Sequence, residues 1–111
     1  MKVDVRTHGS VAVVTPEGPL TRDEVEDFGR ALRGASAERQ GRVVLDLEAV
    51  PYVDSAGLET LLELCGGDDP LVTPRVCGLT ETCREALAIT RVLERLNVFD
   101  TAENAVRSFK R

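Results

Sequence analysis

Three residues that could do chemistry, Asp54, Ser55 and Gly57, lie where an apolar segment gives way to a helical pattern. The apolar segment covers residues 43–47 apart from Asp46, and the helical pattern begins at Ser55. A serine at this position has its hydroxyl beside a carboxylate and beside the unpaired N–H groups of a helix N-terminus. The hydroxyl could act as a nucleophile, cap the helix or accept a phosphate group, and each chemistry makes its own demands on the rest of the chain.

The nucleophile hypothesis lacks a base. Residues 53–57 resemble the second half of the G-x-S-x-G motif of serine hydrolases, but Val53 stands in place of the first glycine. A serine nucleophile needs a general base, and the single histidine, His8, lies in the first predicted turn, far ahead of the serine. Asp54 is adjacent to Ser55 but is a weak base. The sequence therefore predicts no catalytic residues, and we expect that the chain is not an enzyme.

The other two hypotheses, a helix cap and a phosphate acceptor, both agree with the residues around Ser55. Serine is among the best N-cap residues, where it contributes about 1 kcal/mol to a helix. A phosphoserine carries about −1.5 to −2 charges at neutral pH, and a helix N-terminus tolerates an anion. With Asp54 adjacent and Glu59 one turn along, a phosphate would make this surface strongly acidic. A partner that had bound the neutral hydroxyl would then be repelled, so phosphorylation of Ser55 would act as a binding switch.

Strand and helix patterns alternate along the chain after an initial hairpin. Alternating and apolar segments predict strands over residues 2–6, 11–14, 42–47, 74–79 and 98–99. Helical spacing predicts helices over residues 21–37 and 55–65, a third from residue 80 and a fourth from residue 100 or 101. This order is typical of an α/β domain with a mainly parallel sheet, which the hairpin makes mixed.

Two of the predicted helices carry more specific signals. The first begins with residues 21–24, which match a capping box in which the Thr21 hydroxyl and the Glu24 carboxylate would satisfy N–H groups. The second is predicted to end at the run of residues 66–70. Its buried face is expected to consist of Leu58, Leu61, Leu62 and Cys65.

The length and charge of the chain limit the classes of function. The chain has 111 residues and a net charge of −5 at pH 7, which predicts one domain over residues 1–111. An acidic balance argues against nucleic-acid binding, which needs a basic face. No apolar run approaches the ~20 residues of a membrane-spanning helix, so membrane insertion is not expected, and the charged N-terminus is unlike a signal peptide. We therefore expect a cytoplasmic protein that binds other proteins.

The cysteines and the histidine do not form a recognisable site. Cys65, Cys77 and Cys83 are odd in number and irregular in spacing, unlike a disulfide framework. Each lies in an apolar helical or strand-like pattern, so we expect buried thiols in a reducing cytoplasm. With one histidine no zinc-ligand set can be assembled, and no P-loop is present. The sequence therefore predicts neither a metal nor a cofactor.

The segment around Ser55 also has a family resemblance. Residues 43–58 (VVLDLEAVPYVDSAGL) resemble the signature of STAS domains, in particular those of bacterial anti-sigma factor antagonists. Residues 13–21 are similar to the family's second strand and following loop, and residues 83–101 are similar in spacing to its third helix, last strand and final helix start. The resemblance implies a single STAS domain with a mixed sheet of four to five strands and about four helices, packed mostly on one side.

For function, the resemblance implies an anti-sigma factor antagonist that regulates sigma-factor-dependent transcription. The family's phosphorylated serine maps onto Ser55, its preceding aspartate onto Asp54 and its glycine onto Gly57. The unphosphorylated antagonist would bind an anti-sigma factor that is a serine kinase, phosphorylation of Ser55 would release it, and a phosphatase would reset it. The expected partner-binding residues are Thr21, Asp54, Ser55, Ala56, Gly57, Leu58 and Glu59.

The chain departs from the family pattern at three places. Thr21 stands where the family usually has an aspartate that faces the phosphoacceptor, and Glu59 stands where a small or neutral residue is common. The segment of residues 65–74 is shorter and more irregular than usual. A second interpretation of the same resemblance is a STAS scaffold or adaptor, as a subunit of a signalling assembly or a transport system, with Ser55 acting mainly as a helix cap.

Overall fold

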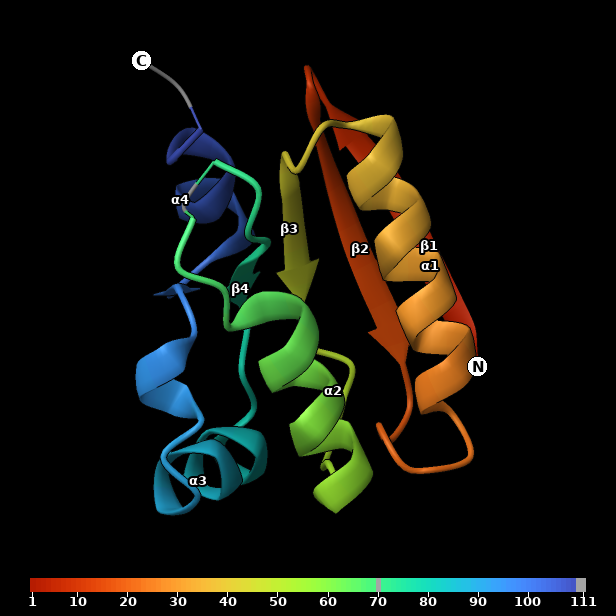
Figure 1. Ribbon diagram of the computed structural model, residues 1–111, viewed down its shortest axis with the longest axis vertical. Helices are drawn as coiled ribbons and strands as arrows, with labels where there is room; N and C mark the ends of the chain where they lie inside the picture. The colour runs from red at the N-terminus through yellow and green to blue at the C-terminus, as the bar shows by residue number, and fades with distance from the viewer. Residues whose placement is uncertain (70, 110–111) are drawn as a thin grey trace.

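A computed structural model describes residues 1–69 and 71–109, and in this part of the chain five strands form a mixed sheet. The strands lie side by side in chain order, β1-β2-β3-β4-β5. β1 is antiparallel to β2, and all other neighbours are parallel (Figure 1). The predicted α/β fold with a mixed sheet is confirmed. The bounds of the strands are Lys2–His8 (β1), Val11–Glu17 (β2), Val43–Asp46 (β3), Arg75–Cys77 (β4) and Val98–Phe99 (β5).

β1 and β2 form a hairpin that is longer than the sequence predicts. His8 pairs with Val11 across a two-residue turn, in which Gly9 adopts a φ of +64°. A positive φ at the first central position is typical of a type II′ turn, whose twist suits a short hairpin. The predicted strands end earlier because residues 7–8 and 15–17 lack the alternating apolar pattern. Pairing between the strands overrides that local preference.

The helices cover the two faces of the sheet unequally. α1, α2 and α3 lie on one face, over a core that includes Val14, Leu45 and Val76. α4 lies on the other face, over a smaller core that includes Val44 and Cys77. The prediction that the helices pack mostly on one side is confirmed. The bounds of the helices are Val25–Glu38 (α1), Ser55–Cys65 (α2), Glu81–Ile89 (α3) and Ala102–Arg107 (α4), with a 3-10 turn at Leu93–Arg95 (η1).

The capping box predicted at the start of the first helix is wrong. α1 begins at Val25 with Glu24 in the N-cap position, and in the described part of the chain no side-chain hydrogen bond closes this cap. Thr21 contributes through its main chain, since its carbonyl oxygen accepts the N–H groups of Glu24 and Val25. The Glu24 carboxylate lies 2.9 Å from the N-terminal nitrogen of Met1, which also lies 3.1 Å from Asp27. A tertiary ion pair has replaced the local contact that the motif suggested.

The buried face of α2 differs in part from the predicted one. Leu61 and Cys65 are fully buried and Leu58 is half-buried, as predicted. Leu62, however, is 36% exposed, so its prediction as a core residue is wrong. Gly57 is buried on this helix in its place. The inner face of α2 is therefore rotated toward its glycine, which brings the helix N-terminus close to the rest of the chain.

Smaller expectations about the second half of the chain have mixed outcomes. α2 ends at Cys65 with Gly66 as its C-cap, as predicted, while Pro70, the last residue of the run 66–70, lies outside the described residues. β4 is shorter than the predicted strand 74–79. The three cysteines are buried and unpaired in the described chain, as predicted. Among the helices of the described residues, none combines the length and the apolar character needed to cross a bilayer.

Candidate functional site

The connector between β3 and α2, residues 47–54, determines where Ser55 lies, and it is anchored on both sides. On one side the N–H of Leu20, just after β2, donates to the carbonyl of Tyr52 at 3.1 Å. On the other side the hydroxyl of Thr80, at the start of α3, donates to the carbonyl of Val50 at 3.1 Å. The connector is therefore held by neighbours that are distant in sequence, and it fixes the position of the α2 N-terminus.

Asp54 is the N-cap residue of α2, and its carboxylate joins two segments of the chain. Oδ1 accepts the N–H of Gly57 at 2.9 Å, and Oδ2 accepts the N–H of Arg22 at 2.9 Å, in the loop between β2 and α1. These two bonds hold the pKa of Asp54 below its ordinary value, and the bond from Gly57 has the larger effect. Asp54 is thus an ionised carboxylate bound to main-chain donors at neutral pH, which makes it unsuited to act as a general base for Ser55.

Gly57 is buried because the chain that follows β2 lies directly against it. A Cβ at this position would collide with the carbonyl oxygen of Leu20. That oxygen also accepts the N–H of Asp54 at 3.2 Å, and Leu20 is fully buried and bridges to Val53. The obstacle is therefore main chain held in place by its own bonds. Close approach of two main-chain segments explains why a glycine stands here.

Ser55 is the first residue of α2 and is exposed. The cap position belongs to Asp54, so the hypothesis that Ser55 itself caps the helix is wrong. The two residues look interchangeable in the sequence, because both are strong N-cap formers. The anchored connector decides between them, and it leaves the Ser55 hydroxyl outside the capping interaction.

The other predicted partner-binding residues are divided between surface and interior. Glu59 is exposed, whereas Ala56, Leu58 and Thr21 are half-buried. Leu58 packs against the larger core, and Gly57 is buried. The accessible part of the predicted surface therefore lies on the N-terminal turn of α2 and on the loop that precedes α1.

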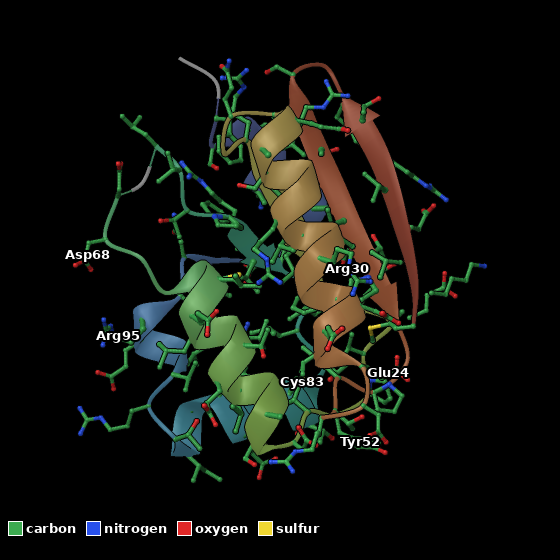
Figure 2. The ribbon with its side chains drawn as sticks, turned by 45° about the vertical axis from the view of Figure 1, so that its right-hand side comes forward. Glu24, Arg30, Tyr52, Asp68, Cys83 and Arg95 are labelled. Carbon is green, nitrogen blue, oxygen red and sulfur yellow. The ribbon has the colours of Figure 1, made fainter. Side chains whose placement is uncertain are left out.

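Two further residues belong to this region and were missed from the sequence. Tyr52 is 48% exposed and lines a groove of about 180 Å³ together with Thr21 and Glu24. Figure 2 shows Tyr52 and Glu24 at the same end of the molecule. The sequence signal that could have identified Tyr52 is an aromatic residue in the connector just before Asp54 and Ser55. Arg22 was missed because it acts through its main-chain N–H, which no side-chain pattern reveals.

The region around Ser55 does not assemble a metal site or a hydrolase triad. Among the residues that the structure describes, no group of three or more His, Cys, Asp or Glu side chains is placed to hold a metal ion. His8 closes the hairpin turn, whereas Ser55 follows the connector at the opposite end of β2 (Figure 1). The structure thus brings Asp54 and Ser55 together with the main chain of the β2–α1 loop, and it keeps His8 away from them.

Known proteins resemble this chain in sequence family and in fold. The sequence model of the STAS domain matches residues 2–105. The fold is similar to that of an anti-sigma factor antagonist from Mycobacterium paratuberculosis, with a TM-score of 0.83 and 20% identity over 99% of this chain and 94% of that one. It is also similar to the Bacillus cell fate determinant SpoIIAA in its phosphorylated form, with a TM-score of 0.64 and 18% identity over 98% of this chain and 100% of that one.

A third similar structure is part of a much larger protein, the murine Slc26a9 anion transporter in its inward-facing state. The TM-score is 0.73 and the identity 20%, over 91% of this chain and 18% of the transporter chain. At such identities the structural likeness shows the fold alone. The family match covers nearly all of the sequence and agrees with the sheet order and the helix placement: this chain belongs to the STAS domain family.

Proposed function

We propose that this protein is an anti-sigma factor antagonist. It binds an anti-sigma factor that is also a serine kinase, through the N-terminal turn of α2 and the loop before α1. Phosphorylation of Ser55 by that kinase ends the binding, and a phosphatase that acts on phospho-Ser55 restores it. The protein works in the cytoplasm and regulates sigma-factor-dependent transcription. The similar structures that are anti-sigma factor antagonists, one of them solved in unphosphorylated and phosphorylated forms, support the proposal.

The observation that carries the proposal is the separation of roles between Asp54 and Ser55. Asp54 supplies the cap and binds the N–H groups of Gly57 and Arg22, so the local fold does not depend on the Ser55 hydroxyl. Ser55 is exposed beside that cap. A kinase could therefore modify Ser55 without breaking the bonds that hold the helix N-terminus in place.

A phosphate on Ser55 would stand beside a permanent negative charge. The lowered pKa of Asp54 keeps this carboxylate ionised at neutral pH, and it already occupies the N–H of Gly57. Fewer N–H groups at the helix N-terminus are therefore available to bind a phosphate on Ser55 than the sequence pattern suggests. Phosphorylation would take the local charge from about −1 to between about −2.5 and −3. Like charges brought together at an interface cost several kilocalories per mole, which is enough to release a partner.

The proposal is tested by affinity capture from a lysate of the native cells, with ADP added. Ser55→Ala and Ser55→Asp serve as paired baits. We expect a kinase-like ATPase that the alanine bait retains and the aspartate bait loses. Incubation of the wild-type protein with that ATPase and ATP should then add phosphate to Ser55, detected by mass spectrometry, while Ser55→Ala stays unmodified. Identical partners on both baits would contradict the phospho-switch.

Ser10→Asp is the matched control for added negative charge. Ser10 is an exposed serine in the hairpin turn, at the end of the molecule away from α2's first turn. This variant should retain the ATPase as the wild type does. Thermal unfolding of both Ser55 variants should lie close to that of the wild type, because Ser55 is exposed and Asp54 makes the capping bond, and changes at exposed positions usually alter stability by less than about 0.5 kcal/mol.

A second candidate function is that of a STAS adaptor within a signalling assembly or a transport system. The fold shared with part of the murine Slc26a9 anion transporter favours it. On this view the same transporter or scaffold proteins would bind the alanine and aspartate baits equally. The paired capture experiment therefore distinguishes the two functions directly.

A further inference from the structure

β1 is an edge strand with seven residues, and along its outer side no strand of the described chain pairs with it. The opposite edge strand, β5, has only two residues. The side chains of Val3, Val5 and Thr7 lie on the α1 side of β1, whereas those of Asp4 and Arg6 lie on the other side. An unpaired strand edge of this length is a template for another strand.

The register of the hairpin determines which main-chain groups of β1 point outward. His8 and Val11 close a two-residue turn, so they form a hydrogen-bonded pair, and such pairs recur at every second residue. The even-numbered residues of β1 therefore bond to β2. The N–H and C=O groups of Val3, Val5 and Thr7 point away from the sheet, where they can bond to a further strand.

We propose that β1 pairs with β1 of a second copy of this chain, antiparallel and about a two-fold axis at Val5. Val5 then faces Val5 of the second copy, and Val3 faces Thr7. The outward groups of these residues form about six main-chain hydrogen bonds across the axis. The two sheets become one continuous sheet with the two hairpins at its centre.

The polar side of β1 is complementary to itself in this register. Asp4 faces Arg6 of the second copy, and Arg6 faces Asp4, so opposite charges meet directly across the strands. Within one chain these two side chains already form an ion pair, with Arg6 Nε 2.9 Å from Asp4 Oδ2. Pairing of two copies therefore places the four charged side chains in a two-by-two array, in which each charge lies next to the opposite charge both along its own strand and across to the other strand. Moving the axis by two residues in either direction shortens the paired segment, because β1 begins at Lys2 and ends at His8.

The apolar side of β1 is also incomplete in the single chain. Val5 is 48% exposed and lines a groove of about 340 Å³ between β1 and α1, together with Ala12, Ala31 and Gly34. A second Val5 would cover the open side of the first one. A second copy is favoured over an unrelated strand because β1 itself supplies both the apolar and the charged complement. Since one strand pair is a small contact, the dimer is weak and depends on concentration.

The first test is sedimentation of the full wild-type chain from about 10 µM to about 1 mM, a range suited to weak association. We expect a monomer–dimer equilibrium in this range. Asp4→Arg alone or Arg6→Asp alone would place like charges opposite each other, and each should weaken dimerisation at least about tenfold. An equimolar mixture of the two variants should recover it, because the basic pair of one chain then faces the acidic pair of the other. Asp100→Arg makes the same charge change at an exposed position outside β1 and should have no effect.

The second test is Val5→Pro. The N–H of Val5 points outward, so proline leaves the bonds between β1 and β2 intact and removes the central donor of the interface. The variant should keep the wild-type far-UV circular dichroism and remain monomeric. A wild-type protein that is monomeric throughout, a dimer that the β1 variants leave unchanged, or a mixture of charge variants that stays monomeric would each overturn the proposal. The mixture changes only exposed charges, so it remains decisive even if the proline variant unfolds.

Discussion

Gly34 and Gly57 both lie inside α-helices, yet alanine should have opposite effects at the two positions. Alanine stabilises a helix interior by about 1 kcal/mol relative to glycine. At Gly34, in α1, an added Cβ meets no atom of the described residues within 4 Å apart from the adjacent backbone of its own helix, and the residue is exposed. We therefore expect Gly34→Ala to stabilise the protein by about 0.5–1 kcal/mol.

At Gly57 the added Cβ must displace the carbonyl oxygen of Leu20. This oxygen accepts the N–H of Asp54, and Leu20 is fully buried, so neither a rotamer change nor a loop shift gives relief. Overpacking of a well-packed site costs about 1–3 kcal/mol, and main chain as the obstacle favours the upper part of that range. After the gain in helix propensity, a net loss of about 1–2 kcal/mol is expected for Gly57→Ala.

Urea unfolding followed by circular dichroism measures both variants against the wild type. The free energies of unfolding of the two alanine variants should differ by about 1.5–3 kcal/mol, which is about 0.5–3 M in urea midpoint for the slopes of about 1–3 kcal/mol/M that are usual in small proteins. Gly34→Ala serves as the control, because it adds the same methyl group to a helix at a position where the methyl group meets no carbonyl oxygen like that of Leu20. If Gly57→Ala were as stable as Gly34→Ala, the close approach of Leu20 would not explain the glycine, and the account of how α2 is positioned would be wrong.

Three further outcomes test other parts of the structure. Thr80→Ala removes the cap of α3 and the bond to the carbonyl of Val50, so we expect a loss of about 1 kcal/mol in thermal unfolding, and an unchanged midpoint would contradict the anchoring of the connector. Because the pKa of Asp54 is lowered, its contribution to stability is complete above the ordinary value of 3.8 and is lost as the pH falls through the lowered pKa. Asp54→Asn should therefore lose less stability than the wild type on acidification in urea titrations, whereas parallel profiles would refute this. Burial raises the pKa of the Cys65 and Cys77 thiols to about 12, so the native protein should react with a thiol reagent at neutral pH far more slowly than the urea-unfolded protein does. Equal rates would show that these thiols are accessible.

The apolar periodicity of the chain predicts which strands and helices exist better than it predicts the residues at which they begin and end. The continuous apolar run at residues 43–45 identifies a central strand, since such a run suits a strand covered on both faces. The hairpin strands extend past the predicted ends because their last residues pair across the sheet, and pairing does not require an apolar side chain. Leu62 has the right spacing for the buried face of α2, but no neighbour covers it fully, and spacing alone does not reveal that.

The capping box at Thr21 and Glu24 failed for a related reason. The four residues match the motif, but Glu24 pairs with the N-terminal nitrogen of Met1, which lies more than twenty positions away in the sequence. A local motif describes one low-energy arrangement of a segment, and a charged partner from elsewhere in the fold can favour another. The same competition decides the start of α2, where two good capping residues follow one another.

The order of the amino acids was enough to predict the alternation of strands and helices, the mixed sheet, the start of α2 at Ser55 and the resemblance to STAS domains. These features follow from apolar periodicity and from turn and helix-start residues, which act over a few positions. The folded chain was needed to show that Asp54 and not Ser55 caps α2, and that a side chain at Gly57 would collide with the main chain. Both depend on the β2–α1 loop. In this loop the N–H of Arg22 donates to the Asp54 carboxylate, and the carbonyl oxygen of Leu20 lies against the start of α2. Contacts between segments about thirty residues apart do not change the apolar periodicity of either segment. They can therefore be recognised in the folded chain but not in the sequence.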